Sequence, residues 1–146
     1  MELYVQCLRS GARMPYRATP DSAGMDVYAC LEHDVVMQPG DIQKIPTGLA
    51  VAPSRKDVAL LLFPRSGLST KYGITLANSV GLIDSDYRGE LLVALIHLGK
   101  EPFTVQDGMR IAQLVCVPIL VPALKQTEQL DATQRGAGGF GASGLT

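Results

Sequence analysis

The run "RIAQLVCVPILV", residues 110–121, is apolar at nearly every position and lacks the 3.6-residue period of an amphipathic helix. Short continuous apolar runs are typical of strands that are buried on both faces. The runs "VALLLF" (58–63) and "ELLVALIHL" (90–98) have the same character. The run "LYVQCL" (3–8) alternates instead, and "DIQKIPTGLAV" (41–51) spaces its apolar residues at Ile42, Ile45, Leu49 and Val51. The sequence therefore predicts strands in all five segments.

Turn-forming residues separate these segments. The chain has 15 glycines and 9 prolines, which are spread along its length rather than pooled in a linker. Such spacing favours an all-β domain. The best helix candidate is a turn or two from Ser66 to Tyr72, and the length of 146 residues fits one domain.

Charge and cysteine content indicate which partners and which cellular compartment to expect. The net charge is -1 and only 18% of the residues are charged, so we expect neither a nucleic-acid partner nor a membrane surface. Cys7, Cys30 and Cys116 are odd in number, lack C-x-x-C spacing and sit in apolar runs, which predicts buried, reduced thiols. The opening residues do not resemble a signal peptide, and no apolar run approaches a membrane span. We expect a protein of the reducing cytoplasm.

The composition changes at Thr133, where "TQRGAGGFGASGLT" begins. This segment cannot build a core, and a floppy terminus is its ordinary interpretation. The alternative is a tail that wraps a phosphate chain with glycine N–H groups, together with one arginine and one phenylalanine.

Several familiar kinds of site do not fit. "GAGGFG" (136–141) matches G-x-G-x-x-G, but only five residues follow Gly141, so no helix can present its N-terminus to a pyrophosphate. His33 and His97 are the only histidines, and neither has a second ligand at metal spacing. "PRSGL" lacks the G-x-S-x-G elbow of a serine hydrolase.

Five polar clusters remain, each beside an apolar strand and anchored by glycine or proline: "SAGMDVYA" (22–29), "PRSGL" (64–68), "NSVGLIDSDYRGE" (78–90), "RIAQLV" (110–115) and "RGAGGFG" (135–141). Read alone, "GLIDSDYRGE" is an ordinary turn, because Asp and Ser cap turns with their own side chains. Together the clusters supply two arginines, Arg65 and Arg135, that suit phosphate oxygens, aromatic residues that can stack on a base, and carboxylates that can orient water.

The order and spacing of all five clusters, from about Ala23 to Gly144, resemble the trimeric deoxyuridine triphosphatases (dUTPases). The resemblance implies a jelly-roll-like β-barrel over residues 1–132 and a Gly-rich tail over residues 133–146. It also implies a homotrimer in which each site takes motifs from more than one subunit and the tail of one chain closes over a neighbour's site.

The implied reaction is hydrolysis of dUTP to dUMP and pyrophosphate, which limits uracil in DNA and supplies dUMP for dTMP synthesis. The resemblance assigns Mg²⁺ to the triphosphate and waters, with no direct protein ligand. Asp84 matches the carboxylate that activates the water attacking the α-phosphorus and that also touches the sugar 3′-hydroxyl. Asp26 matches the acidic residue near the sugar 3′-hydroxyl and the metal's water shell. Tyr87 would pack beneath the deoxyribose, where a ribose 2′-hydroxyl would clash.

The remaining roles concern the base and the phosphates. Asn78 and the backbone of the hairpin from Gly81 to Tyr87, which includes Leu82 and Ile83, would read the uracil edge. Phosphate contacts are implied for Arg65, Ser66, Gly67 and Gln113, with Gln113 counted among the catalytic residues. In the tail, Phe140 would stack on uracil and Arg135 would reach the terminal phosphate, flanked by Gly139, Gly141 and Ser143.

Two positions depart from the family pattern: Ala142 replaces a more usual hydroxyl, and His97 stands where an Asn is commoner. Two other functions stay open. A dCTP deaminase shares the fold but attacks a base carbon. A regulatory protein would use the nucleotide only as a switch.

Overall fold

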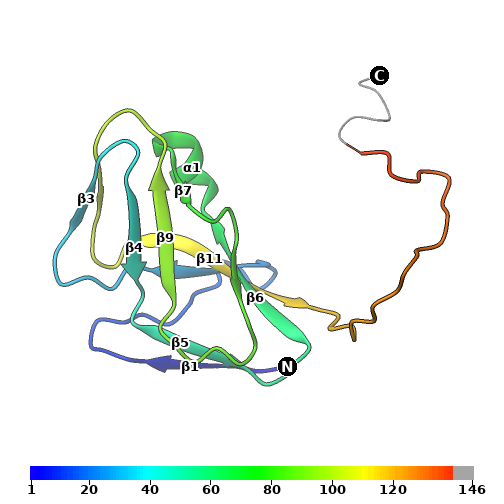
Figure 1. The fold of residues 1–146 in the computed structure, drawn as a ribbon. Helices are drawn as coiled ribbons and strands as arrows, with labels where there is room; N and C mark the ends of the chain where they lie inside the picture. Colours follow the sequence, from blue (N-terminus) through cyan, green and yellow to red (C-terminus); the bar gives the residue numbers. More distant parts are fainter. Residues whose placement is uncertain (140–146) are drawn as a thin grey trace.

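The apolar run that begins at Arg110 forms the longest strand, β11 (Arg110–Pro118), in the interior of a four-stranded sheet. The computed structural model describes residues 1–139. In this sheet β11 pairs with β2 (Met25–Tyr28) on one side and β6 (Val58–Pro64) on the other, and β8 (Gly81–Ile83) pairs with the far edge of β6 (Figure 1). The order across the sheet is β2-β11-β6-β8, and every pairing is antiparallel.

Three smaller sheets complete the fold. The strands β4 (Ile42–Pro46), β9 (Leu92–His97) and β7 (Ile74–Leu76) form one of them in that order. The strand β1 (Leu3–Cys7) pairs with β5 (Leu49–Pro53), and β3 (Val35–Met37) pairs with β10 (Phe103–Val105). Strands dominate the described part of the chain, so the prediction of an all-β, jelly-roll-like fold is confirmed.

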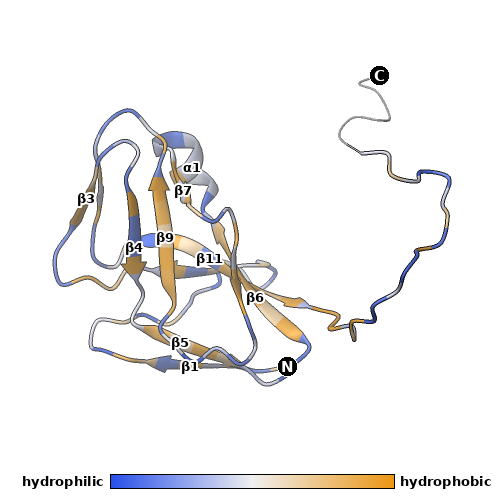
Figure 2. Ribbon diagram, in the orientation of Figure 1, coloured by the Kyte–Doolittle hydropathy of each residue, from blue (hydrophilic) through white to orange (hydrophobic). Residues whose placement is uncertain are grey.

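The core lies between these sheets and draws on most of the predicted strands. Figure 2 shows apolar strands in orange and hydrophilic residues in blue, chiefly in loops. The strand β6 is buried at nearly every position of its first half, as predicted. The strand β9 differs, because it buries Val93, Leu95 and His97 while Ala94 and Ile96 on its other face stay partly exposed. Its run is continuous in sequence, but only one of its faces meets the core.

The segment 41–51 forms two strands rather than one. Its apolar spacing breaks at Thr47 and Gly48, between β4 and β5. Gly48 has φ +69°, a left-handed conformation that side chains disfavour, and a Cβ there would lie 2.8 Å from the Cβ of Ala12. The buried Thr47 hydroxyl donates to the Leu91 carbonyl at 2.8 Å, so this turn is tied to the start of β9.

The helix α1 occupies Ser66–Tyr72, as predicted, and Arg65 stands at its N-cap in extended conformation. The helix ends because Gly73 adopts φ +70°, and its N–H donates to the Ser69 carbonyl of the last turn at 3.1 Å. A Cβ at Gly73 would lie 2.4 Å from the Gly99 nitrogen. The helix is thus fixed against the loop after β9, and this fixes Arg65 at the end of β6.

His97 has a structural role. The side chain is 1% exposed, its Nε2 donates to the Glu101 carbonyl at 2.7 Å, and its Nδ1 accepts the Gly99 N–H at 3.1 Å. Both ring nitrogens therefore hold the loop between β9 and β10. His97, which stands where the family more often has Asn, therefore holds this loop and lines neither of the two pockets described below.

The prediction of buried thiols is correct for Cys30 and wrong for Cys7, which is exposed; Cys116 is partly buried. Cys7 ends β1, a strand that has a partner on only one side, so its side chain reaches solvent. All three are free thiols.

After β11 the chain leaves the barrel. The last strand ends at Pro118, and residues 119–139 extend away from the sheets as an arm without strand or helix (Figure 1). The division of the chain between residues 132 and 133 stays a prediction. Among residues 1–139, no helix has the length and apolarity that crossing a membrane requires.

Candidate active site

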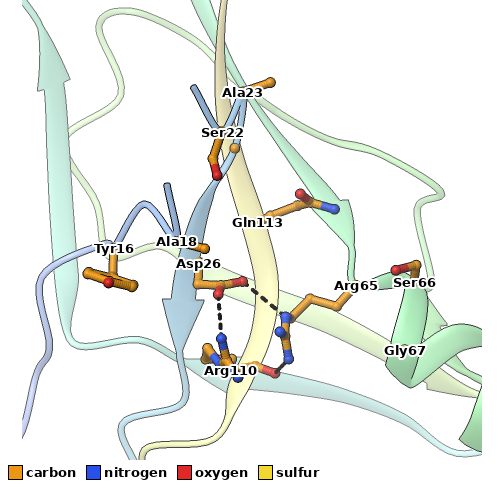
Figure 3. A pocket seen from close by; sticks show the side chains of 11 residues that line it. Tyr16, Ala18, Ser22, Ala23, Asp26, Arg65, Ser66, Gly67, Arg110 and Gln113 are labelled. Atoms are coloured by element: carbon orange, nitrogen blue, oxygen red, sulfur yellow. Dashed lines mark hydrogen bonds and ion pairs between the residues drawn. The ribbon is translucent and has the colours of Figure 1, made fainter. Parts of the chain in front are cut away.

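A cavity of about 410 Å³ opens where β2, β11 and the end of β6 meet (Figure 3). It is lined by predicted residues from three of the five clusters: Asp26, Arg65, Ser66, Gly67 and Gln113. Sheet register explains the assembly, because Gln113 lies opposite Asp26 on one side and Phe63 on the other. We call this cavity the phosphate pocket, after the contacts predicted for its residues.

Asp26 stands at the centre of the phosphate pocket. Its side chain is 14% exposed, and each carboxylate oxygen accepts a hydrogen bond at 3.0 Å, Oδ1 from Arg65 Nε and Oδ2 from Arg110 Nη1. Figure 3 shows both guanidinium groups pointing at this carboxylate. The pocket thus carries two positive charges and one negative charge, which suits an anionic ligand.

Gln113 is held against the wall of the same pocket. Its Nε2 donates to the Pro64 carbonyl at 3.0 Å. Its Oε1 lies so close to Gly24 that a Cβ at Gly24 would stand only 2.8 Å away. The Gln113 amide therefore has room beside residue 24 because glycine has no side chain.

The other predicted residues line a second hollow, of about 200 Å³, beside β8. We call it the nucleoside pocket, after the base and sugar contacts predicted for it. It contains the residues from the cluster 78–90 that are assigned to base and sugar, together with the proposed general base Asp84: Asn78, Gly81, Leu82, Ile83, Asp84 and Tyr87. Gly81 is needed here for packing, since a Cβ would lie 3.1 Å from the Cβ of Leu62 on β6.

The turn after β8 orients Asp84 and Tyr87. The Asp84 carbonyl accepts the Tyr87 N–H at 3.1 Å, which closes the turn, and the Tyr87 hydroxyl donates to the Glu90 carbonyl at 3.1 Å. The Tyr87 side chain is 46% exposed. Within residues 1–139 the Asp84 carboxylate is exposed and has no hydrogen-bond or ion-pair partner, so its oxygens are free to accept a proton.

The two pockets lie apart in one chain. Asp26 on β2 is three strands away from β8, a distance of about 14 Å at ordinary strand spacing. Along the sheet, Asp26 is level with Phe63 of β6, whereas Asp84 follows Ile83, whose partner is Leu60. This offset adds about 13 Å, so the two carboxylates stand on the order of 20 Å apart. A single small group cannot contact both within one chain.

The tail residues are not gathered into either pocket. Arg135 lies on the arm, where its Nε donates to the Gly138 carbonyl at 2.9 Å, and Gly139 is exposed. Phe140, Gly141 and Ser143 lie outside the described residues.

Six lining residues of the phosphate pocket were not among the predicted site residues: Tyr16, Ala18, Ser22, Ala23, Gly24 and Arg110. Gly24 and Arg110 both lie inside the quoted clusters "SAGMDVYA" and "RIAQLV". The signal for Arg110 was a basic residue at the start of an apolar strand. The role of Arg110 in the pocket depends on the pairing of β11 with β2, which the local sequence pattern does not reveal.

The pocket residues bear on how a metal could be held. Among residues 1–139, no cluster of three His, Cys, Asp or Glu side chains is placed to bind a metal ion. Both oxygens of Asp26 are already bonded to arginines, so this carboxylate fits contact through water better than direct ligation. Mg²⁺ usually keeps several waters and binds substrate phosphates, which agrees with such a pocket.

Comparisons with known proteins show which family the chain resembles. The dUTPase family model matches residues 10–144. The chain is 52% identical over 134 residues to a deoxyuridine 5′-triphosphate nucleotidohydrolase of Desulfitobacterium hafniense, covering 92% of this chain and 89% of that protein. It is 49% identical over 145 residues to the protein of the same name from Neisseria meningitidis, covering 99% and 97%.

The solved structures that resemble the chain include two phage dUTPases. The dUTPase of Staphylococcus bacteriophage 80alpha, solved with dUpNHpp, matches with a TM-score of 0.86 at 32% identity and covers 99% of each chain. A mutant dUTPase from phage phi11 of S. aureus, described as coordinating a structural Mg(II) ion, matches with a TM-score of 0.81 at 28% identity, covering 90% of this chain and all of that one.

Proposed function

The chain belongs to the dUTPase family, and on that premise we propose that it hydrolyses dUTP to dUMP and pyrophosphate by attack of water on the α-phosphorus. It is an enzyme of the dUTP diphosphatase class. In the cell this reaction would limit uracil in DNA and supply dUMP for dTMP synthesis.

The observation that carries the proposal is that the two pockets are lined by different kinds of polar groups. The phosphate pocket holds two arginines and an amide around one carboxylate. The nucleoside pocket holds an amide, hairpin backbone, a tyrosine and an unpaired carboxylate. One pocket suits a phosphate chain and the other suits a base and a sugar, which together make a nucleotide.

Asp84 is the proposed general base. Its free carboxylate would take a proton from the attacking water. Asn78 and the β8 backbone would hydrogen-bond to the uracil edge, and Tyr87 would pack against the sugar. Arg65, Ser66 and Gln113 would hold the phosphates and stabilise the charge that develops on their oxygens.

Bound Mg²⁺ would neutralise charge on the triphosphate. The residues that would lie near it are Asp26, through water, and the phosphate-binding side chains around Asp26. This arrangement agrees with the absence of a metal-ligating cluster among residues 1–139.

The working form is proposed to be a homotrimer. By resemblance both Asp26 and Asp84 approach the sugar 3′-hydroxyl, yet they lie on the order of 20 Å apart in one chain. A complete site therefore needs the phosphate pocket of one chain and the nucleoside pocket of another. The arm also supports assembly, because Leu120 and Leu124 are each 95% exposed on it and would be buried only by another chain.

A panel of nucleoside triphosphates, scored for pyrophosphate release with Mg²⁺, tests the proposal. We expect release from dUTP and little from dCTP, dTTP or UTP. Asp84→Asn, which retains shape but cannot accept the proton, should lower turnover by about 10²- to 10⁴-fold without preventing binding of a non-hydrolysable analogue. Ammonia released from dCTP would instead indicate a deaminase. Nucleotide binding without any turnover would favour a regulatory protein.

A further inference from the structure

Arg110 is the one charged residue lining the phosphate pocket for which the proposed reaction has no role. Its Nη1 donates to Asp26 Oδ2 at 3.0 Å, while its side chain remains 47% exposed at the pocket wall (Figure 3). Its backbone also takes part, because the Arg110 carbonyl accepts a hydrogen bond from Arg65 Nη1 at 3.4 Å. Arg110 thus contacts both partners of the other ion pair in the pocket.

The backbone directs Arg110 to this place. The register between β11 and β2 shifts between Arg110 and Ala112, so one residue of β11 has no partner on β2. A bulge of this kind bends the strand and changes the direction of the side chain beside it. Without the shift, alternation along the strand would place residue 110 differently with respect to Asp26.

The N–H donors of Arg65 are bonded within the protein, and the proposed function also requires them to bind phosphate. In the structure its Nε is bonded to Asp26 and its Nη1 to the Arg110 carbonyl. If Arg65 is to bind phosphate oxygens, it must reorient at least one of these donors. Asp26 is only 14% exposed, and a carboxylate so little hydrated is costly to leave without a partner.

We propose that Arg110 is a positioning residue that keeps Asp26 paired and oriented, which releases Arg65 to bind the phosphates. This inference rests on the proposed function. Because two arginines share one carboxylate, the pocket keeps a net positive charge, and Asp26 retains a partner when Arg65 turns to the substrate. Arg110 acts through Asp26 and Arg65 rather than by touching the phosphates.

A double-mutant cycle tests this role. We would compare wild type, Arg110→Met, Arg65→Met and the double variant, measuring kcat and KM for dUTP and the affinity for inorganic tripolyphosphate by calorimetry. Arg110→Met should lower kcat/KM and tripolyphosphate affinity by about 10- to 100-fold, because Arg65 is then held by Asp26. In the Arg65→Met background the same change should cost less than about 3-fold.

Two further variants separate charge from shape. Arg110→Lys keeps a cation that can make the single bond to Asp26, so it should recover most of the loss. Arg13→Met is the control, because Arg13 lies over the ring of Tyr28 at the end of β2 but does not line the phosphate pocket. This substitution should leave the kinetics and the tripolyphosphate binding unchanged. Thermal melting of each variant confirms that the fold is intact.

The outcomes are distinguishable. Full additivity of the two arginine variants would show that Arg110 binds phosphate independently and would overturn the inference. Failure of Arg110→Lys to recover function, or wild type that does not bind tripolyphosphate, would also overturn it. Wild type that binds tripolyphosphate and shows the expected coupling but releases no pyrophosphate from dUTP would overturn the proposed function alone.

Discussion

Gly24 affects the site through the space it leaves. The Gln113 Oε1 and Cβ would lie 2.8 and 3.3 Å from a Cβ at position 24, closer than such atoms normally approach. The Pro64 carbonyl fixes the amide from the other side, so Gln113 has little freedom to retreat. A single added methyl group should therefore move the Gln113 side chain, which we propose binds phosphate.

Gly24→Ala should lower kcat/KM for dUTP by about 10-fold, because displacement of a positioning group by a fraction of an ångström is costly. The melting temperature should change little, since neither residue belongs to the apolar core. The measurement is steady-state kinetics beside thermal melting.

The matched control uses the same contact. In a Gln113→Ala background the 2.8 Å contact with Oε1 is absent and only the 3.3 Å contact with the Cβ remains, so adding Gly24→Ala should have little further effect. An equal loss in both backgrounds would mean that Gly24 acts by another route.

At the scale of elements, the segment after β8 is held in place by Glu90. The Glu90 Oε1 accepts the Gly48 N–H at 2.7 Å, its Oε2 pairs with Arg9, and its carbonyl accepts the Tyr87 hydroxyl. This segment is thereby tied to the β4–β5 turn and to the loop after β1. These contacts hold the turn that carries Tyr87 against two other parts of the chain.

Tyr87→Ala should lose much of its preference for dUTP over UTP, because removing the ring opens space for a 2′-hydroxyl. Rejection of dCTP should persist, since backbone groups that match uracil are left unpaired by cytosine, a mismatch worth about 10⁴-fold or more. The measurement is kcat/KM for dUTP, UTP and dCTP.

Tyr87→Phe is the control, because it keeps the ring and removes only the bond to the Glu90 carbonyl. It should retain most of the sugar preference. A Tyr87→Ala enzyme with an unchanged ratio of dUTP to UTP would remove Tyr87 from sugar recognition.

The arm is the element with least attachment to its own barrel. No residue of 119–139 belongs to the buried core, while Val121 and Leu130 are each 79% exposed. Deleting everything after Asp131 should therefore preserve folding but lower dUTP turnover by about 100-fold, because the tail would bring Arg135 and Phe140 to the substrate. Circular dichroism and steady-state kinetics check the two parts. Unchanged kinetics would restore the interpretation of a floppy terminus.

At the scale of the whole molecule, the sheets hold the two pockets apart and no local motion within one chain can join them. Asp26 lines only the phosphate pocket of the two and Asp84 only the nucleoside pocket, so Asp26→Asn and Asp84→Asn should each damage one of them. If a site combines neighbouring chains, a mixture of the two variants contains some sites with both halves intact.

Each variant alone should be nearly inactive, and trimers formed from an equal mixture should recover about a quarter of wild-type activity, because each half-site is intact in half of the chains. Light scattering should give the mass of a trimer. The experiment requires co-refolding from denaturant and an activity assay. No recovery above the single variants would place the whole site within one chain.

The sequence determined what depends on neighbouring residues. Apolar runs predicted strands such as β6 and β11, and the helix at Ser66–Tyr72 lies where predicted. Polar clusters identified Asp26, Arg65 and Gln113, which do meet in one pocket. These features could be predicted because strand and helix tendencies are local, and because five ordered clusters resemble a known family.

Only the tertiary structure decided which clusters lie together. Strand order separates Asp84 from Asp26, a register shift on β11 brings Arg110 to the Asp26 carboxylate, and close packing gives Gly24 its importance. The burial of His97 between Gly99 and Glu101 was equally hidden. The physical reason is that register and packing are set by contacts between segments far apart in the chain, so no local pattern contains them.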